Sequence, residues 1–190
     1  GGSDRGGQIE PPVAVDVRQG DSGDVVAAGA LPRRRRAEYA IHIGIELDAA
    51  RTKTDPEILQ HCMKGLLACM KKQYVAACHD LSEGGLGVCL AEMAIGGDLG
   101  AAVDISAVGT DLRSDVKLFS ESNTRWVVEV KEEKQALFEK QLKNDHVGFI
   151  LLGKTKGDHL MIKDEGKTII SLSVTVLREC WSKPICDFMG

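Results

Sequence analysis

The chain has 190 residues, a formal net charge of −4 at neutral pH and 43% hydrophobic residues. This length and apolar content suffice for one domain with a buried core, and they exclude a chain that is disordered throughout. The acidic balance and the aromatic content of 4% argue against a dedicated nucleic-acid-binding protein, because such proteins use basic surfaces and aromatic stacking platforms.

The N-terminal part of the sequence predicts a loose segment followed by a domain. Residues 1–24 begin with a run rich in glycine and polar residues and predict a flexible arm or linker, whereas residues 25–190 predict a single domain. A short buried strand is predicted at residues 25–29. A second strand is predicted at residues 39–47, where isoleucine occupies every other position from 41 to 45.

A long amphipathic helix is predicted next, after residue 54. Thr54 and Glu57 have the spacing of a capping box, and Pro56 suits the first helical turn. Apolar residues then recur with helical spacing and predict one stripe that faces the core: Ile58, Leu59, Cys62, Met63, Leu66, Leu67 and Met70.

The most informative segment is the glycine elbow, residues 79–87, which reads His-Asp-Leu-Ser-Glu-Gly-Gly-Leu-Gly. It follows a predicted strand at residues 74–77 and precedes a predicted helix at residues 86–95, which Gly96 and Gly97 end. Glycines let a backbone or a phosphate approach closely, and the free N–H groups at a helix start favour an anion. The elbow matches neither G-x-G-x-x-G nor a P-loop, and a purely structural turn is the simpler alternative on spacing alone.

The rest of the chain alternates strands and helices. Strands are predicted at residues 101–105, 125–130 and 147–152, with a polar loop at residues 106–115. Helices are predicted at residues 132–142 and 175–188, and a hairpin is predicted from residues 159–163 and 168–173. This mixture predicts an α+β fold, in which a mixed β-sheet is layered with α-helices.

The six cysteines form no Cys-x-x-Cys pair and have no histidine at a zinc-finger spacing. They predict reduced thiols in a cytoplasmic protein. The sequence shows no signal peptide and no apolar run of membrane-spanning length.

A second motif follows the polar loop and carries a family resemblance. The Ser-Glu-Ser motif, residues 118–125, reads Leu-Phe-Ser-Glu-Ser-Asn-Thr-Arg and runs directly into the predicted strand. Together with the glycine elbow and the Ala-Glu-Met-Ala helix after it, this motif resembles the C-terminal domain of the aminoimidazole-ribonucleotide synthetase superfamily. The resemblance covers about residues 25–188 and is closest to the phosphoribosylformylglycinamidine synthases, also called formylglycinamide ribonucleotide amidotransferases.

The resemblance implies one domain of a larger purine-biosynthetic ligase. Such an enzyme uses ATP and Mg²⁺ to convert the formyl amide of formylglycinamide ribonucleotide into an amidine, with ammonia supplied by glutamine. Its catalytic histidine and acidic magnesium ligands belong to the preceding N-terminal domain, so the resemblance assigns no catalytic or metal-binding residue here and implies that the chain is inactive alone. The implied partners are that N-terminal domain, a glutaminase domain or subunit and the small-molecule nucleotide substrate, with no nucleic acid and no membrane.

The resemblance places two sets of residues at a ligand site. Nucleotide-binding residues are expected in the glycine elbow: His79, Asp80, Ser82, Gly84 and Gly85. Substrate-binding residues are expected in the Ser-Glu-Ser motif: Ser120, Glu121, Ser122 and Arg125. From their residue types, Asp80 and Ser82 are also candidate helix caps, and Arg125 either pairs with Glu121 or faces a phosphate. Glu92 is expected to pair with Arg125 if its side of the helix is buried.

The two motifs are therefore expected to lie side by side and to form half of one pocket. Asn123 and Phe119 resemble the second of the two tandem copies found in the single-chain enzyme, and that copy lies nearer an auxiliary nucleotide site. Four arginines, residues 33–36, stand where the family has Leu-Gly-Gly-Ser, and only Glu38 and Tyr39 of that segment match. The alternatives are a catalytically silent scaffold that docks the glutaminase, and another superfamily enzyme such as selenophosphate synthetase or a small-molecule kinase.

Overall fold

The structure, a computed structural model, describes residues 38–44 and 55–189 of the chain. The arm predicted at residues 1–24, the strand predicted at residues 25–29 and the arginine run lie outside these residues. Within the described part of the chain, no helix is both long enough and apolar enough to cross a membrane.

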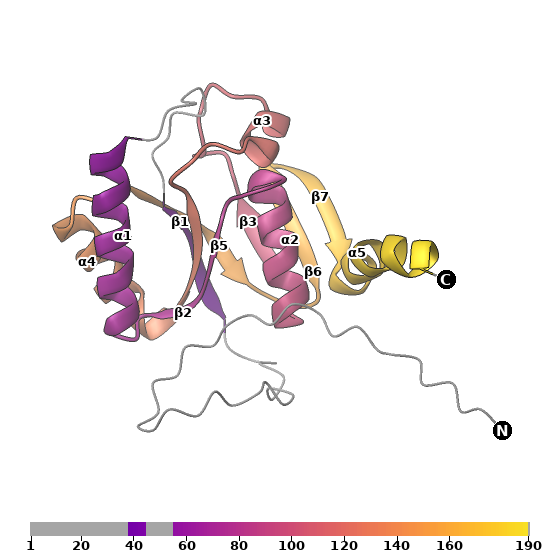
Figure 1. Cartoon of the computed structure of the whole chain (residues 1–190), viewed down its shortest axis with the longest axis horizontal. Coiled ribbons are helices and arrows are strands. Elements are labelled where there is room, and N and C mark those ends of the chain that lie inside the picture. Colours follow the sequence, from indigo (N-terminus) through magenta and orange to yellow (C-terminus); the bar gives the residue numbers. More distant parts are fainter. Residues whose placement is uncertain (1–37, 45–54, 190) are drawn as a thin grey trace.

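One mixed sheet organises the fold (Figure 1). Its seven strands are β1 (Tyr39–Gly44), β2 (Val75–Asp80), β3 (Ala101–Asp104), β4 (Trp126–Lys131), β5 (Phe149–Thr155), β6 (His159–Asp164) and β7 (Lys167–Ser173). They lie in the order β2-β4-β1-β5-β3-β6-β7. The pair β3–β6 is parallel and every other neighbouring pair is antiparallel. The predicted α+β fold with a mixed sheet is confirmed.

Helices cover the sheet on both sides. In the described residues the α-helices are α1 (Pro56–Lys71), α2 (Gly85–Gly97), α3 (Ser114–Phe119), α4 (Gln135–Asn144) and α5 (Val174–Met189), and a short 3-10 helix, η1 (Glu132–Lys134), precedes α4. Figure 1 shows α1 beside α4, and α2 beside α3 and α5. Neighbouring residues of β4 point to opposite faces, so Val127 packs with the residues of α2, whereas Val128 packs with those of α1 and α4. All six residues of β1, an inner strand that lies between β4 and β5, are buried as a result.

Two expectations for α1 are wrong. The N-cap residue of the helix is Asp55, whose carboxylate accepts hydrogen bonds from the N–H groups of Glu57 and Ile58, whereas the sequence assigned the cap to Thr54, which lies outside the described residues. The apolar stripe is also only half buried. The fully buried residues of α1 are small, Cys62, Gly65 and Cys69, and Ile58 and Leu66 are partly buried beside them. Three larger members of the predicted stripe stay exposed: Met63, Leu67 and Met70.

The C-terminal hairpin forms as predicted. Strands β6 and β7 are joined by Glu165 and Gly166, which have φ values of 49° and 76°. Two residues with positive φ give the turn the twist that an antiparallel pair requires, and glycine adopts that conformation without a Cβ penalty. Pro184 lies inside α5.

Buried His42 makes the stability of this fold depend on pH. The ring is 0% exposed, lies against Phe138 and Phe149, and places Nε2 3.0 Å from the Glu139 carboxylate. Burial lowers the pKa of His42, and this effect outweighs the opposing effect of Glu139. The unfolded chain therefore binds a proton more tightly at this position, so stability is present above about pH 6.5 and is lost as the pH falls.

We expect the free energy of unfolding to fall between about pH 7 and pH 5, and this fall to be smaller in a His42→Leu variant. Urea titrations at both pH values measure the difference. His61→Asn, which alters an exposed histidine of α1, is the matched control and should keep the wild-type pH dependence. Equal pH dependence in His42→Leu and in the wild type would contradict the assignment.

Candidate functional site

The glycine elbow is a sharp strand-to-helix turn. Strand β2 runs on to Asp80, three residues further than predicted, so His79 and Asp80 end a strand and do not belong to the loop. Leu81 is buried and its N–H donates to the carbonyl oxygen of Arg125. Gly84 and Gly85 then have φ values of 77° and 62°, a conformation that favours glycine, and α2 begins at once.

The Ser-Glu-Ser motif lies directly against this turn. The Gly84 N–H donates a 2.8 Å hydrogen bond to the Glu121 carboxylate. A Cβ on Gly85 would lie only 2.7 Å from the Ser120 carbonyl oxygen and 2.8 Å from that of Leu118. Two segments more than 30 residues apart in sequence thus meet, and at Gly85 their backbones approach too closely to leave room for a Cβ.

Glu121 places a negative charge at the start of α2. A carboxylate at that position is favoured, because the first N–H groups of a helix lack partners within the helix and carry partial positive charge. The N-cap residue of α2 is Gly84, which provides no side chain for capping. The expectation that Ser82 caps this helix is therefore wrong, and Glu121 supplies the carboxylate from outside the helix.

Arg125 braces the Ser-Glu-Ser motif internally. Its side chain is buried, and its guanidinium donates to the carbonyl oxygens of Ser120 and Ser122 and to Ser120 Oγ. Neither of the two expected ion pairs, with Glu121 or with Glu92, forms. The five donors of a guanidinium suit this role, since several carbonyls of one loop can be held at once.

The remaining elbow residues form a polar cluster at the surface. His79 Nε2 lies 3.4 Å from the Glu92 carboxylate, and Ser82 Oγ donates a 3.0 Å hydrogen bond to Asp80. The side chain of Asp80 is 66% exposed and that of Glu92 is 40% exposed. These groups can accept hydrogen bonds from a ligand or donate hydrogen bonds to it. Across residues 38–44 and 55–189, no group of three or more His, Cys, Asp or Glu side chains could hold a metal ion.

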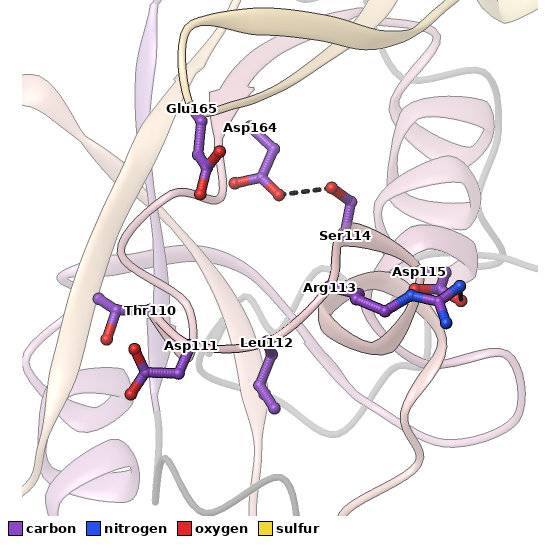
Figure 2. A pocket seen from close by; sticks show the side chains of 8 residues that line it. All are labelled: Thr110, Asp111, Leu112, Arg113, Ser114, Asp115, Asp164 and Glu165. Carbon is purple, nitrogen blue, oxygen red and sulfur yellow. Dashed lines mark hydrogen bonds and ion pairs between the residues drawn. The ribbon is translucent and has the colours of Figure 1, made fainter.

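An open depression of about 660 Å³ lies at the other end of α3 (Figure 2). It is lined by Thr110, Asp111, Leu112, Arg113, Ser114, Asp115, Asp164 and Glu165. Asp164 accepts hydrogen bonds from Lys117 and Ser114, and these two donors lower the pKa of its carboxyl group. The sequence does not predict this cluster, because α3 and β6 are brought together only by the tertiary fold.

Comparisons with known proteins agree with the fold and with the family that the sequence resembles. The family model "AIR synthase related protein, C-terminal domain" matches residues 22–162. The chain is 37% identical over 118 residues to "Phosphoribosylformylglycinamidine synthase subunit PurL" of Alkaliphilus metalliredigens, and 32% identical over 144 residues to the protein of that name from Moorella thermoacetica. These alignments cover 62% and 76% of the chain but only 16% and 18% of the relatives, so the chain matches less than a fifth of their length.

Solved structures share the fold at low sequence identity. "T. maritima PurL complexed with ATP" superposes with a TM-score of 0.67 at 18% identity, covering 76% of this chain and 26% of that one. "Hydrogenase Maturation Protein HypE in complex with ATP" gives a TM-score of 0.54 at 16% identity, covering 74% of this chain and 52% of that one.

Proposed function

Because the chain belongs to the AIR synthase related family and matches the C-terminal domain of that family, we propose that it is part of a phosphoribosylformylglycinamidine synthase. In this proposal it forms one wall of a ligand site in a cytoplasmic enzyme of purine biosynthesis. A preceding domain completes the site, and a glutaminase domain or subunit supplies ammonia. The sequence relatives that carry this enzyme's name support the proposal.

The observation that carries the proposal is the contact between the two motifs. The Gly84 N–H is bonded to Glu121, and Gly85 rests on the Ser120 carbonyl oxygen. The carboxylates of Asp80 and Glu92 are also exposed. In this proposal, residues of both motifs face the ligand.

The proposed reaction converts an amide into an amidine. An amide oxygen is a poor leaving group, so ATP first transfers a phosphoryl group to that oxygen. Ammonia then attacks the amide carbon, and the oxygen leaves as phosphate. In this proposal the magnesium ligands belong to the preceding domain of the full enzyme. The role of this chain is to position and hydrogen-bond the ligand. Preorganised hydrogen-bond donors at such a site require no reorganisation during the reaction.

A chimera tests the proposal. Residues 22–162 of this chain would replace the matching segment of the Alkaliphilus metalliredigens relative, and amidine formation would be measured from formylglycinamide ribonucleotide, ATP and ammonia. We expect turnover by the chimera and none by the isolated 190-residue chain. A folded chimera that binds neither ATP nor the ribonucleotide would contradict the proposal.

Within that chimera, Glu121→Ala is expected to lower kcat/KM by about tenfold or more. The reason is that the variant removes a hydrogen bond to a charged group, worth about 1.5–3 kcal/mol, from the join between the two motifs. Glu133→Ala, which alters an exposed glutamate after β4, is the matched control and should keep the parent activity. Equal kcat/KM values for the Glu121→Ala and Glu133→Ala chimeras would show that Glu121 does not contribute to the site.

The internal contacts of the two motifs favour a second candidate function, a non-catalytic scaffold domain. Glu121 already occupies the start of α2, and Arg125 is held by its own loop, so these groups have partners without any ligand. If the domain is a scaffold, the chimera needs residues 22–162 only for folding and docking. Glu121→Ala would then change the stability of the chimera but not its KM for ATP or for the ribonucleotide.

A further inference from the structure

A buried ion pair joins α3 to the end of β6. Lys117 Nζ lies 2.8 Å from Asp164 Oδ1, and Ser114 Oγ donates a 2.6 Å hydrogen bond to Asp164 Oδ2. The side chains of Lys117 and Asp164 are only 1% and 6% exposed. Figure 2 shows the Ser114 hydroxyl pointing at the Asp164 carboxylate. Charges removed from water are stable only in well-defined paired geometry, so this contact permits little movement of α3.

The two contact points also fix the rotation of α3 about its own axis. Ser114 and Lys117 are three residues apart, so they lie on the same side of the helix, and both bind one carboxylate. An apolar side chain at position 117 could fill the same space, but it would not distinguish one rotation of the helix from another. Directional hydrogen bonds do make that distinction.

The opposite end of the same short helix carries the contacts to the glycine elbow. Helix α3 has six residues, and the N–H of its C-cap residue Ser120 donates to the carbonyl oxygen of Val116. The carbonyl oxygens of Leu118 and Ser120 are those on which Gly85 rests, and Glu121 follows directly. A rotation or shift at Lys117 would therefore displace the groups that meet the elbow.

We infer that Lys117 and Asp164 are positioning residues for the glycine elbow. The pair fixes α3 against β6, and α3 in turn holds the Glu121 carboxylate on the Gly84 N–H. Neither residue of the pair contacts the elbow itself. This coupling involves only contacts within the chain, so it does not depend on which ligand binds at the elbow.

Amide hydrogen exchange of the full chain, followed by NMR, tests the inference. We expect Asp164→Asn to speed exchange at the Gly84 amide at least tenfold, because Glu121 would no longer be held on it. Amides of β1 and α4, which lie away from α3, report the accompanying loss of overall stability, because Asp164→Asn also leaves the buried Lys117 ammonium without its partner. Asp115→Asn is the matched control, since it breaks the exposed Arg113–Asp115 pair on the same helix and should leave Gly84 unchanged.

Ser114→Ala is a milder second variant, which removes one hydrogen bond and keeps the ion pair. It should raise exchange at Gly84 by a smaller factor in the same direction, and it decides the question if Asp164→Asn does not fold. Unchanged exchange at Gly84 would overturn the inference. In Ser114→Ala, which keeps the ion pair, amides of β1 and α4 should keep their wild-type rates. An equal rise at Gly84, β1 and α4 in that variant would also overturn the inference, since it would report a loss of overall stability and no specific coupling.

Discussion

Replacing Gly85 with alanine is expected to lower the free energy of unfolding by about 3 kcal/mol, the sum of two effects of about 1–3 kcal/mol each. The first is the positive φ of 62°, which disfavours any residue with a Cβ. The second is a clash, since the new Cβ would lie 2.7 Å from one backbone oxygen and 2.8 Å from another. For a chain of this length such a loss lowers Tm by about 6–12 °C, which differential scanning calorimetry would measure.

Gly97→Ala, at the other end of the same helix, is the matched control. Its added Cβ would meet only the side chain of Leu99, at 3.9 Å, and Gly97 has no positive φ. Alanine is the better helix former, so this variant should gain up to about 1 kcal/mol. Similar Tm changes for the two variants would show that the elbow does not depend on close backbone approach.

Asp164→Ala is expected to destabilise the protein by about 3–5 kcal/mol, because it leaves the buried Lys117 ammonium without its partner. Chemical denaturation of the wild type and the variant would measure this difference. Adding Lys117→Met to Asp164→Ala should recover part of the loss, since the unpaired charge is then removed as well.

An exposed ion pair at the start of α3, the helix that carries Lys117, provides the contrast. Arg113 and Asp115 also lie 2.9 Å apart, but their side chains are 83% and 56% exposed. Water solvates both charges, so Asp115→Ala should change stability by less than about 1 kcal/mol. A comparable loss for Asp115→Ala and Asp164→Ala would contradict the role assigned to burial.

Local sequence signals predict the strand and the helix on either side of the glycine elbow, but they do not predict α3, whose first residues fall in the predicted polar loop at residues 106–115. The glycine elbow is predicted between a strand and a helix because glycine and polar residues punctuate the chain there. The hairpin at Glu165 and Gly166 is predicted for the same reason. Both signals act over a few residues, so no knowledge of the tertiary fold is required to interpret them.

The largest errors concern packing between distant parts of the chain, whereas the N-cap of α1 and the end of β2 are local errors of one to three residues. The stripe of α1 follows helical periodicity, but tertiary packing selects its small residues for the interior and leaves Met63 and Leu67 exposed. The partners of Glu121 and Asp164 lie 37 and 47 residues away, and no periodicity encodes such pairs. The side chain that meets the helix start is therefore Glu121, where the sequence alone favoured a cap from within the elbow.

The most direct test of the shared ligand wall is hydrogen–deuterium exchange of the chimera with and without formylglycinamide ribonucleotide and ATP. If residues 79–87 and 118–125 form one surface of the site, peptides from both segments should gain protection together over the same range of ligand concentration. Protection of one segment alone, or of neither while the chimera binds ligand, would contradict that claim.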